Sequence, residues 1–132
     1  EASIFRGLNV ENNLRAVLEV VEPDRKRREH RLDELLDEFQ IQHIRKSPSI
    51  ALSGGERRRV EIARSLATNP HYMLLDEPFN KLDAELRGAI RGFVFDHLRE
   101  RGIPCLMVTH DRADAPAGGR VLRLMDGEVR DD

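Results

Sequence analysis

The stretch Leu52-Ser53-Gly54-Gly55-Glu56 is the segment around which the rest of this chain is organised. Ser53 is a favourable N-cap residue and Glu56 follows it in the next turn, so the stretch predicts a helix that opens with a capping box. Two glycines in the first turn weaken a helix, which indicates that another group approaches the backbone there. A helix N-terminus favours an anion such as phosphate. The alternative is a capped helix with two permissive residues and no ligand.

The chain before this stretch predicts helices only. Apolar residues at helical spacing predict one helix that Asn9 caps and that runs through Val21, and a second over residues 25–39. The helix that opens at Gly54 is expected to continue to about Ala67. Residues 1–70 are therefore interpreted as a helical subdomain.

After residue 70 the pattern changes to alternating strands and helices. The apolar run 71–76 predicts a buried strand, residues 84–101 a long helix, and residues 103–109 a second strand. Gly88 and Gly92 lie four positions apart in that helix and predict close packing against a neighbour. The pattern indicates an α/β fold in which residues 71–132 form part of a parallel sheet.

The C-terminal residues predict a loop followed by a hairpin. Residues 113–119 favour a loop with one turn, and Asp126-Gly127 joins two short strands as a strong hairpin turn.

Composition excludes several classes of protein. The net charge of −2 gives no overall attraction for nucleic acid, and a single cysteine excludes an internal disulfide framework. That cysteine, Cys105, lies in an apolar run and is expected to be buried and reduced, as in a cytoplasmic protein. No apolar run approaches the length of a membrane helix. His30, His43, His71 and His97 show no metal-ligand spacing and are expected on the surface or in helices.

Two further motifs follow the glycine stretch. The first strand ends in Met73-Leu74-Leu75-Asp76-Glu77-Pro78, and the second ends in Val108-Thr109-His110-Asp111. Ligands of open α/β sheets bind at the carboxyl ends of the strands, so these acids and this histidine are candidate site residues. Taken singly, an acid pair can be a turn or a helix cap, and His110 an ordinary residue at a strand end.

In this order, the three motifs resemble the signature motif, the Walker B motif and the switch histidine of the ATP-binding cassette (ABC) ATPases. The resemblance extends from residue 1 to about residue 128. It implies a P-loop-NTPase-like fold and part of the nucleotide-binding domain of a transporter, which couples ATP binding and hydrolysis to transport across a membrane. Residues 1–79 resemble the lipopolysaccharide-export ATPases, so lipid or lipopolysaccharide is the expected cargo.

The resemblance assigns roles to individual residues. The acid at Asp76 would hold Mg²⁺, which prefers hard oxygen ligands, and Glu77 would orient and activate the attacking water. His110 would contact the γ-phosphate. Asp83 matches the aspartate of the D-loop, although Asn80-Lys81-Leu82 departs from the usual Ser-Ala-Leu.

In this family the signature acts on a second cassette. The residues Ser53, Gly54, Gly55 and Glu56 would therefore bind ATP held by a partner cassette. The resemblance implies two kinds of partner, a second cassette in a dimer and membrane permease subunits. It also implies a location at the cytoplasmic face of the membrane.

The P-loop pattern G-x-x-x-x-G-K does not occur in this sequence, since no glycine is followed by lysine. The P-loop cradles the phosphates in this family, so the chain alone is expected to bind ATP weakly and to hydrolyse little. The P-loop strand also pairs with the strand that precedes His110, so an open sheet edge is expected there.

Alternatives to an active transport cassette remain. From Asn80 onward the chain resembles other transport cassettes, which suggests a chimera of two cassettes joined near residue 79. A truncated or chimeric fragment could serve as a catalytically inert structural or binding module. A cassette of the DNA-repair or translation type is a further possibility, although the short signature subdomain argues against the repair type.

Overall fold

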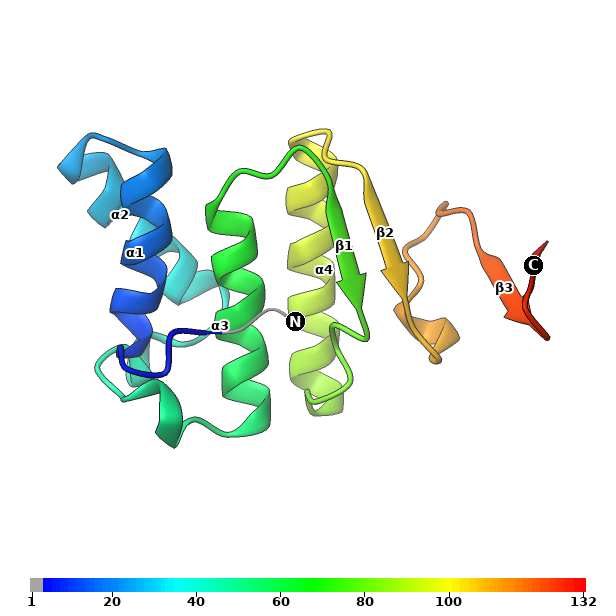
Figure 1. Ribbon diagram of the computed structural model, residues 1–132, viewed down its shortest axis with the longest axis horizontal. Helices are drawn as coiled ribbons and strands as arrows, with labels where there is room; N and C mark the ends of the chain where they lie inside the picture. Colours follow the sequence, from blue (N-terminus) through cyan, green and yellow to red (C-terminus); the bar gives the residue numbers. More distant parts are fainter. Residues whose placement is uncertain (1–3) are drawn as a thin grey trace.

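The computed structural model describes residues 4–132 and begins with the predicted helices (Figure 1). The helical part consists of α1 (Val10–Val21), α2 (Arg25–Glu38), the 3₁₀ helices η1 (Gln42–Ile44) and η2 (Ser49–Ala51), and α3 (Gly54–Ala67). Asn9 caps α1, because its side chain accepts a hydrogen bond of 2.9 Å from the backbone N–H of Asn12. The three long helices and the Asn9 cap are confirmed.

The sheet consists of two parallel strands, β1 (Met73–Asp76) and β2 (Cys105–Val108), connected by α4 (Ala84–Glu100). Met73 is in register with Cys105, and Asp76 with Val108. Both strands therefore end at the same edge of the sheet, which brings the residues that follow them side by side. The predicted α/β fold class is confirmed, with a parallel sheet that within residues 4–132 consists of β1 and β2.

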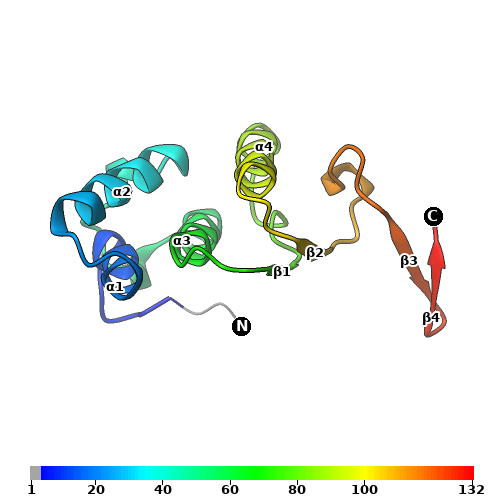
Figure 2. The same cartoon turned by 90° about the horizontal axis from the view of Figure 1, so that it is seen from above.

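The sheet is covered on one side only within residues 4–132. Figure 2 shows α4 on one side of β1 and β2, while Leu74, Leu106 and Val108 expose 64%, 62% and 52% of their surface. The prediction that residues 71–76 form a buried strand is therefore correct only for Met73 and Leu75, because the alternate side chains of β1 are exposed. Cys105 is exposed as well, contrary to expectation. Among the described residues β2 pairs only with β1, so its other edge is open, as predicted.

The glycines of α4 do not mark close packing. A Cβ atom added to Gly88 or Gly92 would have no atom within 4 Å. The prediction of a close helix contact at these two positions is wrong, since both lie on the exposed face of α4.

The chain ends in a hairpin that lies at the opposite end of the molecule from α1 (Figure 1). The short helix η3 (Arg112–Asp114) precedes it, and β3 (Leu122–Met125) pairs with β4 (Glu128–Asp131) in antiparallel fashion. Asp126 and Gly127 have φ angles of +52° and +81°, the left-handed conformation that this turn requires. The hairpin and the single turn in the preceding loop are confirmed.

One hydrophobic core extends across the predicted boundary at residue 70. It contains Phe39 and Leu66 from the helical part and Phe79 and Val94 from the α/β part, all fully or almost fully buried. Phe39 and Phe93 pack edge to face with ring centroids 5.0 Å apart. No helix within residues 4–132 is long and apolar enough to cross a membrane.

Candidate functional site

Glu77 and His110 meet where β1 and β2 end. The backbone N–H of Glu77 donates to the carbonyl of Val108 at 2.8 Å, which extends the parallel ladder by one residue. The backbone N–H of His110 donates to Glu77 Oε1 at 2.9 Å, and Nδ1 of the ring lies 2.8 Å from the same oxygen. The structure therefore brings these two predicted site residues into direct contact.

The backbone of Glu77 adopts an uncommon conformation. Its φ angle is +43°, in the left-handed region that residues other than glycine rarely occupy. Such conformations cost free energy and persist only where the surrounding structure enforces them. Here the ladder bond to Val108 and the contact with His110 fix the residue on both sides.

The charge of Glu77 acts directly on His110. The hydrogen bond from the ring to the Glu77 carboxylate, together with the attraction between the two charges, raises the pKa of His110. The other carboxylate oxygen, Glu77 Oε2, is buried and has no hydrogen-bond partner among residues 4–132. One oxygen of this carboxylate is thus engaged, and the second has unused acceptor capacity.

Asp76 lies exposed at the last position of β1, next to Glu77. Within residues 4–132 no group of three or more His, Cys, Asp or Glu side chains could hold a metal ion by itself. Mg²⁺ does not need such a cage, since it is commonly bound by one or two carboxylates together with water and phosphate oxygens. A single exposed carboxylate at the end of a parallel strand fits that use.

The signature stretch forms the predicted capping box. Ser53 Oγ accepts from the backbone N–H of Glu56 at 3.1 Å, and Glu56 Oε1 accepts from the backbone N–H of Ser53 at 2.9 Å. The hydrogen bond from the Ser53 backbone is the main cause of the lowered pKa of Glu56. The Glu56 carboxylate is therefore engaged by the start of its own helix.

The group that approaches the two glycines is part of the same chain. A Cβ atom on Gly55 would lie 3.0 Å from the backbone carbonyl oxygen of Lys81, and one on Gly54 would lie 3.5 Å from Cδ of the same residue. The loop before α4 thus accounts for the small residue at Gly55. Within residues 4–132 no hydrogen bond or ion pair joins this stretch to Glu77 or His110.

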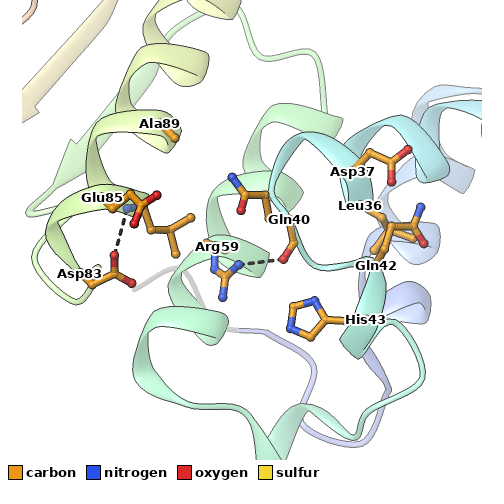
Figure 3. Close-up of a pocket in the computed structure, with 10 residues that line it drawn as sticks. Leu36, Asp37, Gln40, Gln42, His43, Arg59, Asp83, Glu85 and Ala89 are labelled. Carbon is orange, nitrogen blue, oxygen red and sulfur yellow. Dashed lines mark hydrogen bonds between the residues drawn. The ribbon is translucent and has the colours of Figure 1, made fainter.

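Asp83 caps α4 and lines the rim of a cavity. Its side chain accepts from the backbone N–H of Leu86 at 3.0 Å. The cavity has a volume of about 570 Å³ and lies between α2, η1, α3 and the start of α4 (Figure 3). Asp83 is the only predicted site residue among those that line it.

Arg59 lines this cavity, and its position there was not predicted from the sequence (Figure 3). Its guanidinium donates to the carbonyls of Gln40 at 2.8 Å and Phe39 at 3.3 Å. Arg59 stands in a run of three arginines, for which an exposed helix face is the default expectation. A buried arginine in such a run carries no sequence signal of its own.

Asp114 and Arg87 form an ion pair close to the site in sequence and were not predicted. Asp114 is 1% exposed and pairs with Arg87. Their sequence separation is 27 residues, and neither belongs to one of the three motifs. One sequence signal could have predicted this pair. Asp114 is a carboxylate shortly after the strand-end histidine, and Arg87 is an arginine one turn into the preceding helix.

Comparisons with known proteins agree with this arrangement. The family described as ABC transporter matches residues 1–80. A probable ABC transporter ATP-binding protein of Azorhizobium caulinodans is 63% identical and aligns with 97% of this chain and 48% of its own length. The lipopolysaccharide export system ATP-binding protein LptB of Escherichia coli is 49% identical over 84% of this chain and 46% of its own length.

A solved structure shows the same fold. The ATP-binding cassette MJ0796, in its dimeric structure bound to ADP and Pi, superposes with a TM-score of 0.87 at 30% identity. The match covers 99% of this chain and 59% of the MJ0796 chain.

The alignments also bear on length and on the idea of a chimera. The chain spans about half the length of the curated relatives it matches. The Azorhizobium relative alone covers 97% of the chain, so both sides of residue 79 are similar to one and the same protein. Two parent cassettes are therefore not needed to explain the sequence. With its signature helix, its acid pair and its strand-end histidine in this order and this fold, the chain belongs to the ABC transporter family of ATP-binding cassettes.

Proposed function

We propose that this chain supplies the signature helix, the acid pair and the switch histidine of a transporter ATPase that binds ATP with Mg²⁺. The observation that carries the proposal is the contact of Glu77 Oε1 with both the backbone N–H and the ring of His110. This contact lies at the carboxyl ends of two adjacent parallel strands, where open α/β sheets bind their ligands.

Glu77 is suited to act as a general base. Its carboxylate lies at the strand ends in contact with His110 and its side chain is 27% exposed, so a water molecule bound beside it could transfer a proton to it. Asp76 would hold Mg²⁺, which neutralises charge on the phosphates of the bound nucleotide. Ser53, Gly54 and Gly55 lie at the start of α3, and the backbone N–H groups of Gly54 and Gly55 in its first turn suit a phosphate held by a facing cassette, whereas the N–H of Ser53 donates to Glu56.

The role of the whole protein follows from its relatives. LptB is named for lipopolysaccharide export, and similarity to it at 49% identity supports a lipid or lipopolysaccharide as cargo. The dimeric MJ0796 structure supports a second cassette as partner. We further propose that the assembly works on the cytoplasmic face of a membrane through permease subunits. The alternative is an inert module that keeps the fold without catalysis.

The test supplies the part of the cassette that the relatives have and this sequence does not contain. Binding of Mg²⁺-ATP is measured by calorimetry on the chain alone and after mixing with the part of the Azorhizobium relative that lies outside the matched region. We expect weak binding by the chain alone, and tight binding with hydrolysis by the mixture. Glu77→Gln should abolish hydrolysis and keep binding, whereas His71→Gln, at an exposed histidine that precedes β1, should change neither.

Each outcome has a definite meaning. Normal hydrolysis by the Glu77→Gln mixture would show that Glu77 is not the base. A mixture that assembles and never binds ATP would favour the inert module.

A further inference from the structure

A buried carboxylate, Asp114, ties the loop after β2 to helix α4. Asp114 is 1% exposed and forms a two-point ion pair with Arg87 of α4. Arg87 Nε lies 2.9 Å from Oδ1, and Nη2 lies 2.5 Å from Oδ2. Paired charges of this kind fix orientation as well as distance, because the planar guanidinium and carboxylate must face each other.

The same pair reaches both neighbours of His110. On one side, Thr109 Oγ1 donates to Asp114 Oδ2 at 3.0 Å. On the other, Arg87 Nη2 lies 3.1 Å from Asp111 Oδ2, and the backbone N–H of Asp111 donates to Thr109 Oγ1 at 3.1 Å. The residues before and after His110 are therefore both bonded to the Asp114–Arg87 pair, which is called the anchor below.

His110 itself has little to hold its side chain. Its side chain is 76% exposed, so packing does not orient the ring. Its backbone N–H donates a hydrogen bond to Glu77, and Nδ1 of its ring lies within hydrogen-bond distance of the same carboxylate oxygen. The direction of both groups depends on the backbone between Thr109 and Asp111, and that backbone is what the Asp114 and Arg87 pair fixes.

The surroundings of Asp114 also favour the charged form of its carboxylate. Burial acts to raise the pKa of Asp114, but the hydrogen bonds from Arg87 and Thr109 outweigh it and the pKa is lowered. Arg91 adds a second cation 3.7 Å from Oδ1 and donates to the carbonyl of Ala113. Asp114 is therefore a buried charge with several directional partners, and removal of its charge leaves those partners unmatched.

We infer that Asp114 is a positioning residue, which acts with Arg87 through Thr109 and Asp111 to keep His110 in contact with Glu77. The consequence for ATP hydrolysis rests on the proposed function, but the contact itself does not. In an assembled cassette, loss of the anchor should lower kcat without a matching change in nucleotide affinity.

The test measures the His110 contact directly on the 132-residue chain. Hydrogen exchange of the His110 backbone N–H is followed by NMR in the wild type and in Asp114→Asn. We expect the variant to exchange about tenfold faster or more at His110, because the N–H loses its fixed acceptor. Exchange at Met73, whose N–H donates to Pro104 at the other end of the ladder, should stay nearly unchanged.

A matched control is present in the hairpin. Arg120 and Asp131 form the same two-point pair at 2.9 and 3.2 Å, on the exposed surface of the molecule. Asp131→Asn removes the same charge and should leave exchange at His110 at the wild-type rate. Arg87→Lys, which keeps the cation and loses the two-point geometry, should fall between the wild type and Asp114→Asn.

The outcomes separate this inference from the proposed function. Unchanged exchange at His110 in a folded Asp114→Asn chain would overturn the inference. If Asp114→Asn does not fold, Thr109→Val decides in the same way, because it removes both the hydrogen bond from Thr109 Oγ1 to Asp114 and the one from the Asp111 N–H to Thr109 Oγ1. The measurement needs no nucleotide, so failure of ATP binding would count against the proposed function alone.

Discussion

Gly55 of the signature stretch lies against the backbone of Lys81, so that a Cβ atom at Gly55 would come within 3.0 Å of the Lys81 carbonyl oxygen. The first turn of α3 and the loop before α4 are thus in contact through a glycine. At Gly54 the corresponding atom would meet only the flexible Lys81 side chain, at 3.5 Å. The two neighbouring glycines are therefore expected to differ in their tolerance of a side chain.

We predict that Gly55→Ala is less stable than Gly54→Ala by about 1 kcal/mol or more. Both substitutions gain a similar amount from helix propensity, so the difference reports the clash with the Lys81 carbonyl. Urea unfolding of the two variants measures it. Equal stability would show that the loop before α4 moves away at no cost.

The exposed glycines of α4 are predicted to respond in the opposite direction. No atom lies within 4 Å of a Cβ placed on Gly88 or Gly92, and both stand in the interior of a helix. Alanine at either position should stabilise the protein by about 0.5–1 kcal/mol. Gly102→Ala is the control, since its φ of +63° disfavours alanine and the substitution should destabilise. Thermal unfolding would show the two opposite shifts, and no gain at Gly88 or Gly92 would contradict the prediction.

The local features of this fold could be predicted from the sequence. The Asn9 cap, the capping box at Ser53 and the turn at Asp126-Gly127 each depend on a few adjacent residues, and all three formed as predicted. The exposure of Leu74 and Cys105 could not be predicted, because an apolar strand pattern does not show whether anything covers the second face of a sheet.

In the candidate site, too, some residues could be predicted from the sequence and others could not. The order of the three motifs indicated Glu77 and His110, and the parallel register then placed them in contact. The anchor at Asp114 and the buried Arg59 were missed. Charged residues are common on helix and loop surfaces, and only the tertiary packing selects the few that become buried.

His97 lies in α4, as expected of it, but it is buried and gives the protein a pH-dependent stability. It is 8% exposed and packs against the ring of Phe93. Burial, with smaller contributions from Arg101 and Arg31, lowers the pKa of His97 to about 4. The charged groups that act on it are these two arginines, and Glu38 of α2 in turn interacts with both arginines.

The sign of the pH effect follows from this lowered pKa. The unfolded chain protonates His97 near the ordinary value of 6.5, whereas the folded chain resists protonation until about pH 4. The contribution of His97 to stability is therefore fully present above about pH 6.5 and is lost as the pH falls toward 4. Between pH 7 and pH 5 we expect a loss of up to about 2 kcal/mol.

Urea unfolding at pH 7 and pH 5 checks this prediction. His97→Leu should lose less stability than the wild type over that interval, since it removes the group that binds the extra proton on unfolding. His71→Leu, at an exposed position, should keep the wild-type pH dependence. An equal loss in the wild type and in His97→Leu would assign the effect to other groups.

Arg59 joins the end of α2 to the signature helix. After α2 ends at Glu38, Gln40 adopts the left-handed conformation at a φ of +55°, and the N–H of Ile41 donates back to the carbonyl of Leu36 at 2.8 Å. The carbonyls of Phe39 and Gln40 do not accept any of the backbone hydrogen bonds that close this helix end. The guanidinium of Arg59 donates to both of them. Burial lowers the pKa of Arg59, although the group stays charged at neutral pH.

We predict that Arg59→Met destabilises the protein by about 1–3 kcal/mol, because it keeps the apolar length and leaves two carbonyls without a donor. The end of α2 should loosen first, so amide exchange at Ile41 should rise more than exchange at Met73 in β1. Arg57→Met, which removes a more exposed guanidinium from the same helix, is the matched control and should cost little. If the two variants are equally stable, the carbonyls of Phe39 and Gln40 find water in place of Arg59, and the buried arginine contributes packing alone.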